Sequence, residues 1–286
     1  MISIKTSKTL IACLSVIGLF SMINPASSTV FSIDEFKVTR ANGNLVFLDP
    51  FSDGNAPPNA PSFNNGNSGS YSTTGTFGPE SGGKLALNTA LGVPTEATGR
   101  PGQNLVLNAR LQTNIDQTNT TNGLKAANDF IVSGLFDLST LPGNLREGFG
   151  VRLSDGGISA SVNDNVELMV RRNVAGELVV SYRRVDIVAD LVTTIDSILF
   201  ELGHQQVLLE LSKLNAATRT ITASFAYVDG GTIGTRTVFA NTTDIFNGET
   251  ATRASFRATT PIPLPPTAFL ALLGLAAMVL VRKRNA

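Results

Sequence analysis

The chain has 286 residues, and its 22 Lys and Arg residues balance its 22 Asp and Glu residues. This balance excludes the strongly basic surface with which many proteins bind nucleic acids, so we expect no nucleic-acid partner. The single cysteine, Cys13, excludes a disulfide framework and a cysteine-based zinc site.

The first 28 residues have the composition of a secretory signal peptide. Lys5 and Lys8 form a basic beginning, and residues 9–23 are a mostly apolar run. Ala26 and Ser28 then place small residues at the −3 and −1 positions of a signal-peptidase site. We therefore predict an N-terminal signal helix, cleavage after Ser28 and export through the inner membrane.

The region between the two chain ends, residues 29–260, is predicted to form one domain. It carries 17 cations and 22 acids, and about 230 residues suffice to bury a core. From Asp53 to Gly83, 21 of the 31 residues are Gly, Pro, Asn or Ser. Because such a composition buries little apolar surface, we predict a flexible loop over 53–83.

The rest of the domain alternates apolar and polar residues with a period of two, which is typical of half-buried strands. The alternating segments are Asn104–Thr113, Phe149–Leu153, Val166–Arg171, Leu178–Val185, Val207–Leu211 and Ile221–Tyr227. Asn173–Gly176 has the composition of a hairpin turn, and Asp229 with the two glycines after it is expected to end the last strand. This patterning predicts an all-β fold, an antiparallel β-sandwich. Residues 186–200 remain ambiguous between helix and strand.

Short segments of the middle region resemble a known superfamily. They are Leu135-Phe136-Asp137-Leu138, residues 148–156 and the two hairpins that follow. Together they resemble the jelly roll of concanavalin A-like lectins and glucanases. The resemblance implies a jelly-roll sandwich. Members of that superfamily bind sugars, hydrolyse glycans or serve structural roles, so the fold alone does not choose among these functions.

Motifs for catalysis are scarce. The glucanase string Glu-x-Asp-x-x-Glu does not occur, and the nearest acidic pair is Asp186 and Asp190. His204 is the only histidine, and a lone histidine before a strand is typical of a surface or hydrogen-bonded residue. We therefore predict a non-catalytic protein. A glycan hydrolase stays as an alternative, because distant strands can bring two carboxylates together.

Calcium and sugars are the two ligands for which the sequence offers candidates. Asp49, Asp53 and Asn55, or residues 163–165, can supply oxygen ligands for calcium, although the same residue types form turns without a metal. We therefore predict no cofactor, with calcium as the alternative. For stacking on a sugar ring the chain has no Trp and only three tyrosines, Tyr71, Tyr182 and Tyr227.

The last 26 residues have three parts. The first is the proline-rich string Pro261, Ile262, Pro263, Leu264, Pro265 and Pro266. The second, residues 267–281, is apolar, and as a helix it would span about 22 Å against roughly 30 Å for a bilayer core. The third is the cationic run Arg282, Lys283 and Arg284, which we expect to stay in the cytoplasm and to stop the transmembrane helix.

This tail resembles the PEP-CTERM class of C-terminal sorting signals on exported proteins of Gram-negative bacteria, and in particular its VPLPA-CTERM variant. Pro263-Leu264-Pro265 matches the core of that variant, whereas Ile262 replaces the usual valine and Pro266 the usual alanine. The resemblance implies an exosortase, a membrane-embedded cysteine transpeptidase, as a partner. It also implies a transient single-pass intermediate in the inner membrane, with a cytoplasmic C-terminus, and a final location at the cell surface or outside.

The two ends and the sandwich together lead to one functional expectation. We predict a non-catalytic structural or adhesive role in extracellular polymer, with extracellular polysaccharide as a candidate partner. A lectin-like carbohydrate-binding module is the alternative, and a glycan hydrolase without a recognisable motif is the third possibility.

Overall fold

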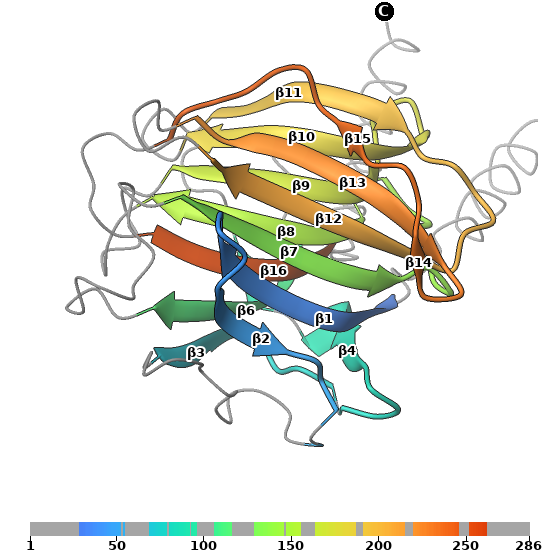
Figure 1. Ribbon diagram of the computed structural model, residues 1–286. Coiled ribbons are helices and arrows are strands. Elements are labelled where there is room, and N and C mark those ends of the chain that lie inside the picture. Colours follow the sequence, from blue (N-terminus) through green and yellow to red (C-terminus); the bar gives the residue numbers. More distant parts are fainter. Residues whose placement is uncertain are drawn as a thin grey trace, which may run out of the picture. The chain divides into compact units, whose positions relative to one another are not determined.

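Two antiparallel sheets of eight strands each form the part of the chain that the computed structural model describes (Figure 1). The described residues are 29–52, 54, 69–78, 80–91, 93–95, 106–115, 129–145, 147–155, 164–186, 191–214, 220–245 and 252–261. They all belong to one unit. They contain no α-helix, and none of them forms a helix long and apolar enough to cross a membrane.

The first sheet, sheet A, has six strands in a row and two beside them. In spatial order the row is β14 (Thr232–Ile233), β13 (Thr222–Asp229), β12 (Gln206–Lys213), β7 (Phe130–Asp137), β1 (Val30–Arg40) and β2 (Leu45–Asp49). Strand β15 (Thr237–Val238) pairs with β13, and β4 (Leu85–Asn88) pairs with β1. A single 3₁₀ turn, η1 (Thr89–Leu91), follows β4.

The second sheet, sheet B, lies behind sheet A in the view of Figure 1. Its strands run in the order β11 (Leu191–Leu199), β10 (Leu178–Asp186), β9 (Asn165–Arg172), β8 (Gly148–Asp155), β16 (Thr252–Pro261), β6 (Val106–Ile115) and β3 (Gly69–Thr74). The short strand β5 (Val93–Thr95) pairs with β6.

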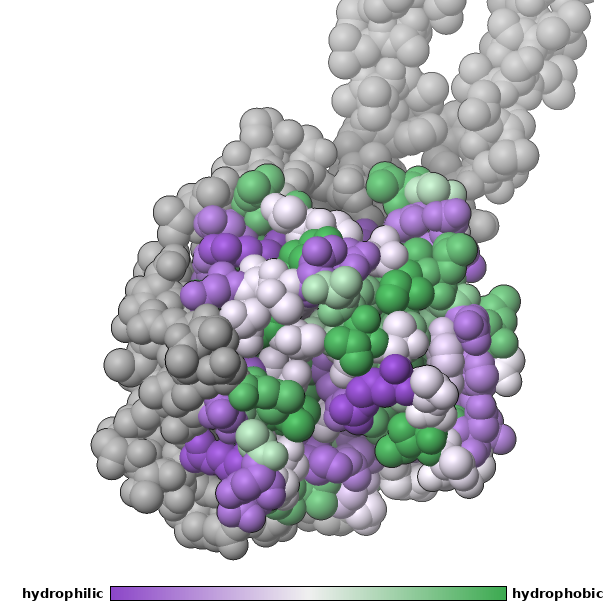
Figure 2. Space-filling model, turned by 45° about the horizontal axis from the view of Figure 1, so that its top comes forward, coloured by the Kyte–Doolittle hydropathy of each residue, from purple (hydrophilic) through white to green (hydrophobic). Residues whose placement is uncertain are grey.

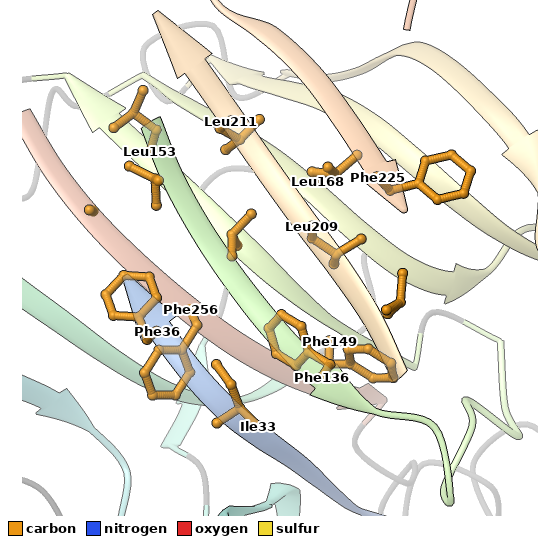
Figure 3. Close-up of a cluster of buried hydrophobic side chains, with 14 of the residues drawn as sticks. Ile33, Phe36, Phe136, Phe149, Leu153, Leu168, Leu209, Leu211, Phe225 and Phe256 are labelled. Atoms are coloured by element: carbon orange, nitrogen blue, oxygen red, sulfur yellow. The ribbon is translucent and has the colours of Figure 1, made fainter. Parts of the chain in front are cut away.

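Apolar side chains from the two sheets meet in one core (Figure 3). Phe36 of β1 packs against Phe256 of β16 with ring centroids 5.2 Å apart, and Phe136 of β7 against Phe149 of β8 at 5.0 Å. Each pair joins sheet A to sheet B, and such aromatic pairs stabilise a core beyond their buried area. The described residues are thus all-β and consistent with the predicted antiparallel β-sandwich.

Both predicted hairpins are confirmed. Strands β9 and β10 pair antiparallel around a turn in which Gly176 N–H donates to Asn173 O at 3.0 Å. Gly176 has φ +83°, a left-handed conformation that a residue without Cβ adopts easily. Strands β12 and β13 pair from Gln206 to Ser212, and β13 ends at Asp229 as expected.

Strand β3 departs from the loop expected over 53–83. Residues Gly69–Thr74 pair antiparallel with β6, from Ile115 to Arg110. The loop was predicted from the high content of Gly, Pro, Asn and Ser, although residues 69–74 also contain Tyr and Thr, which favour strands. Pairing with β6 supplies the backbone hydrogen-bond partners that this short strand needs. The ambiguous residues 186–200 contain strand β11.

The predicted targeting segments lie outside the described residues. These are the signal helix with Ala26 and Ser28, the sorting residues from Ile262 to Pro266, the apolar run 267–281 and the basic run from Arg282 to Arg284. Pro261 is described: it is the last residue of β16 and pairs with Val106 of β6. The proline-rich string therefore begins at the end of an interior strand of sheet B.

Candidate functional site

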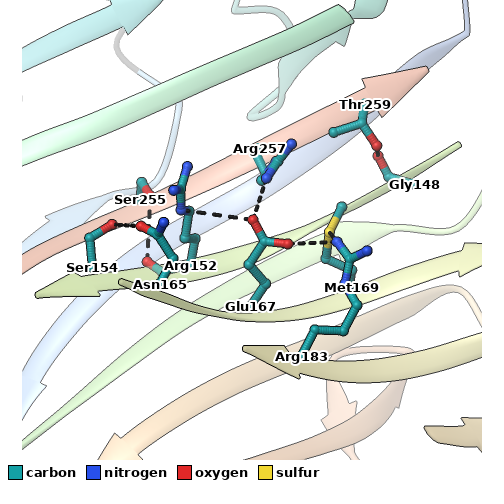
Figure 4. Close-up of polar contacts among 10 residues, drawn as sticks. All are labelled: Gly148, Arg152, Ser154, Asn165, Glu167, Met169, Arg183, Ser255, Arg257 and Thr259. Atoms are coloured by element: carbon teal, nitrogen blue, oxygen red, sulfur yellow. Dashed lines mark hydrogen bonds and ion pairs between the residues drawn. The ribbon is translucent and has the colours of Figure 1, made fainter. Parts of the chain in front are cut away.

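A buried carboxylate surrounded by three guanidinium groups is the most concentrated charge cluster among the described residues (Figure 4). Glu167 of β9 has a side chain only 1% exposed, and Arg183 of β10 donates to its Oε2 from Nη2 at 2.6 Å. Arg257 of β16 donates to Oε1, and Nε of Arg152 of β8 lies 3.8 Å from the same oxygen. We call these four residues the Glu167 cluster.

The alternation of the strands places this cluster on the side of sheet B that faces away from the core. Val166 and Leu168, the neighbours of Glu167 in β9, are both fully buried in the core, so Glu167 points to the other side. The ladder sets Arg152 directly opposite Glu167 on one flank and Arg183 opposite it on the other. Opposite charges at paired positions stabilise a sheet, so local sequence and register together produce this contact.

The contact of Arg257 with Glu167 depends on a glycine. Arg257 pairs with Gly150 of β8, which lies between β16 and β9 in the sheet. Gly150 has no side chain, so the Arg257 guanidinium passes over β8 to reach Glu167. A Cβ at position 150 would lie 2.1 Å from Leu168 O and 2.7 Å from the Met169 Cα, distances that real atoms do not adopt.

Electrostatics keep Glu167 ionised. Burial by itself would raise the pKa of its carboxyl, but the positive charges of Arg257, Arg183 and Arg152 outweigh burial and hold that pKa far below its usual range. Burial also lowers the pKa of Arg183, and the charge of Glu167 opposes that shift. The cluster thus combines three cations with one fixed anion, and Glu167 has no proton to donate as a general acid.

Neutral hydrogen-bonding groups flank the cluster on the same side of sheet B. Ser154 donates to Asn165 Oδ1, and Thr259 Oγ1 donates to Gly148 O at 3.5 Å (Figure 4). Ser255 Oγ donates to Arg152 O at 3.5 Å. These hydroxyl and amide groups are buried, and their hydrogen bonds join neighbouring strands of sheet B.

The calcium candidates fall in different places. Asp49 is buried, and its Oδ1 accepts the Phe51 N–H at 2.9 Å, which is the turn geometry considered as the alternative. Asp53 and Asn55 lie outside the described residues. In the described part of the chain, no three His, Cys, Asp or Glu side chains gather as a metal site.

The second group of calcium candidates, residues 163–165, is not gathered into a metal site either. Asn163 lies outside the described residues. Asp164 accepts from Arg184 at 2.7 Å, and Asn165 accepts from Ser154. The structure therefore engages Asp164 and Asn165 with separate side chains on neighbouring strands.

The tyrosines considered for sugar stacking differ in exposure. Tyr182 is fully buried and donates its hydroxyl to Ile221 O at 2.9 Å, so its ring offers no surface to a ligand. Tyr227 is half-buried and stacks on His204, with ring centroids 4.0 Å apart and planes 11° apart. The side chain of Tyr71 lies outside the described set.

His204 is a hydrogen-bonded surface residue, as expected. Its Nδ1 lies 2.6 Å from Asp229 Oδ2, and this hydrogen bond raises the pKa of the imidazole. Asp229 Oδ1 also accepts the Gln205 N–H at 2.8 Å, so the pair holds the loop that enters β12 against the end of β13.

A second charge cluster, which the sequence did not predict, lies on the outer side of sheet A. Lys84 pairs with Asp137 and lies 3.8 Å from Asp34 Oδ1, while Gln206 donates to Asp34. Burial raises the pKa of Asp34. One ammonium group attracts both carboxylates and holds them close together, so this arrangement suits a cross-link between strands better than an acid–base pair.

Surface hydropathy does not single out a site. On the face shown in Figure 2, apolar residues are scattered among polar ones. The exposed large apolar side chains of the described residues include Val174, Leu191, Leu199, Leu202 and Ile233. Isolated apolar residues of this kind are normal on soluble proteins. The Glu167 cluster is therefore the best-defined candidate site.

Sequence analysis did not identify the Glu167 cluster, although part of its signal is local. Arg152, Glu167 and Arg183 each occupy a polar position within a segment predicted as a strand. Arg257 lies in β16, for which no strand was predicted, and β16 is inserted next to β8 from about 100 residues away. Comparison with models of protein families, with curated proteins and with solved structures finds no match to this chain.

Proposed function

We propose that this protein is exported and has a non-catalytic, structural or adhesive role in the polymer outside the cell. The observation that supports it best is the Glu167 cluster, where one ionised carboxylate joins side chains from four adjacent strands. Such a network cross-links the strands of sheet B. It supplies neither a proton donor nor an activated nucleophile, which a hydrolase needs.

Export is proposed from the two chain ends. The basic and apolar beginning of the sequence supports secretion, and the tail after Pro261 supports sorting by an exosortase-type transpeptidase. Because β16 ends at Pro261, a cut between Pro261 and Pro266 would remove the apolar tail and leave every described strand in the product. The concanavalin A-like jelly roll is likewise proposed, on the pairing of the two hairpins within two packed sheets.

The intact mass of the protein from cell-surface and medium fractions tests export and processing. We expect a chain that begins at Thr29 and ends between Pro261 and Pro266, with or without an added group. The same fractions should contain the protein bound to extracellular polymer after washing. A mass that retains residues 267–286, recovered only with membranes, would contradict the proposal.

The non-catalytic part of the proposal has a separate test. The purified protein is incubated with the washed extracellular polymer of its own cells, and newly released reducing ends are measured. We expect none above the value for heat-inactivated protein. A time-dependent release that requires folded protein would replace the structural role with glycan hydrolysis.

A further inference from the structure

Glu147 is a fully buried carboxylate that pairs with no cation among the described residues. Its Oε2 accepts the backbone N–H groups of Gly143 and Asn144 at 2.6 and 2.8 Å and Asn144 Nδ2 at 3.4 Å. Its Oε1 accepts the Thr29 hydroxyl. The other buried glutamates in the described part of the chain each pair with an arginine. Glu147 is thus held by neutral donors alone.

The residue that contacts Oε1 is the first one after the predicted signal-peptidase site. Thr29 directly precedes β1 and extends the pairing of that strand with β4. Its N–H donates to Thr89 Oγ1 at 3.2 Å, and its carbonyl oxygen accepts the Thr89 N–H at 3.2 Å. Thr89 is itself fully buried. The bonds that hold Thr29 in place therefore come from residues that remain after cleavage.

The backbone nitrogen of Thr29 lies close to the buried carboxylate. Three covalent bonds separate this nitrogen from Oγ1 of the same residue, so the two atoms are at most about 4 Å apart. Because Oγ1 is hydrogen-bonded to Glu147 Oε1, the nitrogen lies within about 7 Å of that oxygen. A positive charge on the nitrogen would attract the carboxylate strongly, since Glu147 is screened from water.

Signal-peptidase cleavage would create that positive charge. Hydrolysis of the peptide bond between Ser28 and Thr29 consumes one water molecule, leaves a carboxylate on Ser28 and leaves the nitrogen on Thr29 as an ammonium. An α-amino group has an ordinary pKa of about 7.7–8.0, so it is charged at neutral pH. The amide nitrogen has one N–H, which Thr89 Oγ1 already accepts, whereas the ammonium has three. The two additional N–H groups are charged donors that the uncut chain lacks.

We infer that cleavage after Ser28 completes the fold, because the new N-terminal ammonium of Thr29 forms an ion pair with buried Glu147. The inference rests on the proposed function, which includes this cleavage during export, and gives the cleavage a structural consequence. In the uncut chain Glu147 is buried without this counter-charge, which lowers stability. The domain therefore reaches its full stability only after the signal peptide has been removed, outside the cytoplasm.

Insertion of one glycine between Ser28 and Thr29 tests the ion pair in the exported protein. Ala26 and Ser28 keep their places before the cut, so the cleaved chain begins with the added glycine. Thr29 then has an amide nitrogen again, and the ammonium lies one residue further away, about 3.8 Å between Cα atoms. We expect the midpoint of thermal unfolding to fall by about 3–10 °C, as for the loss of a charged hydrogen bond in a domain of this size.

Glu147→Gln separates the charge of the side chain from its shape. If the ammonium pairs with Glu147, the insertion should lower the midpoint by less than about 1 °C in the Glu147→Gln protein, because the two changes remove the same interaction. If Glu147→Gln does not fold, the insertion alone decides. The control is Val30→Ala, a change at an exposed neighbour of Thr29, which should shift the midpoint by less than about 2 °C. N-terminal sequencing establishes the first residue of each protein.

Three outcomes would overturn the inference. They are an unchanged midpoint after the insertion, an equal fall with and without Glu147→Gln, and an exported protein whose first residue is not Thr29. The proposed function fails separately. A protein that is found in extracellular polymer but shows no coupling between the two changes refutes only the ion pair. A protein that begins at Thr29 and shows the coupling, but is absent from extracellular polymer, refutes only the proposed function.

Discussion

At the scale of single residues, Glu167 is the side chain whose loss should matter most for stability. Replacing it by Gln removes the only carboxylate that the three arginines of the cluster share among the described residues. Breaking a buried ion pair on one side typically costs about 3–5 kcal/mol, because uncompensated charge stays buried. We expect Glu167→Gln to lower the free energy of unfolding by that amount in urea titrations.

The matched control for this variant is Glu35→Gln. Glu35 pairs with Lys37 at 3.1 Å on sheet A, and both side chains are about a third exposed. Partly exposed pairs contribute about 0–1 kcal/mol, so this variant should unfold almost as the wild type does. An equal loss in the two variants would show that the Glu167 cluster is no stronger than an ordinary surface pair.

The pH dependence of stability follows from the same carboxyl. The pKa of Glu167 is lowered in the folded protein relative to its ordinary value of 4.5. Its contribution to stability is therefore complete above about pH 4.5. Below that value the unfolded chain takes up a proton that the folded chain does not, so stability falls as the pH falls towards the folded pKa.

We accordingly expect the free energy of unfolding to decrease more steeply between pH 5 and pH 3 in the wild type than in Glu167→Gln. Urea titrations at several pH values, with the two slopes compared, measure this difference. Parallel slopes would mean that Glu167 is not held ionised by its three arginines.

At the scale of elements, the contact between β8 and β9 depends on Gly150. A Cβ there would lie 2.1 Å from the Leu168 carbonyl oxygen, so Gly150→Ala must push the two strands apart. It would also obstruct the path of Arg257 to Glu167. Overpacking typically costs about 1–3 kcal/mol, and we expect a loss of that size in thermal or urea unfolding.

Gly143→Ala is the control for Gly150→Ala. A Cβ at Gly143 would meet only Oε2 of Glu147, at an ordinary 3.6 Å. We expect its free energy of unfolding to stay within about 0.5 kcal/mol of the wild type. If the two alanine variants proved equally stable, the close approach of β8 to β9 would not constrain position 150.

The strength of the apolar–polar alternation in each strand explains which strands could be predicted from the sequence. The hairpins β9–β10 and β12–β13 have strong local alternation and clear turn residues, so the pattern alone identifies them. In β1 a bulge between Ile33 and Glu35 shifts the pairing register, which interrupts the period of two. In β16 small residues such as Ala254 and Ala258 face the core, so the contrast with their polar neighbours is weak.

At the scale of the whole molecule, the fold class follows from local patterning, whereas the candidate site does not. Alternation predicts strands and therefore sheets. The Glu167 cluster needs the order β10, β9, β8, β16, and that order is set by packing between segments far apart in the chain. Arg257 and Arg152 are brought together only because the last described strand enters the middle of sheet B.

This central place of β16 leads to a prediction about truncated chains. Phe256 is fully buried and packs against Phe36, Phe51 and Phe77. A chain that ends at residue 251 loses this ring, and β8 and β6 each lose the strand that pairs with them on one side. We expect it not to fold, as judged by circular dichroism and by the loss of a cooperative unfolding transition.

A chain that ends at Pro266 retains all of β16 and should unfold cooperatively, with the midpoint of the full-length protein. The two truncations differ by only 15 residues, and the physical difference between them is one interior strand. If the shorter chain folded as well as the longer one, sheet B would be stable without its central strand. If both failed to fold, residues beyond Pro266 would be needed for the sandwich, and removal of the tail during sorting would be incompatible with a folded product.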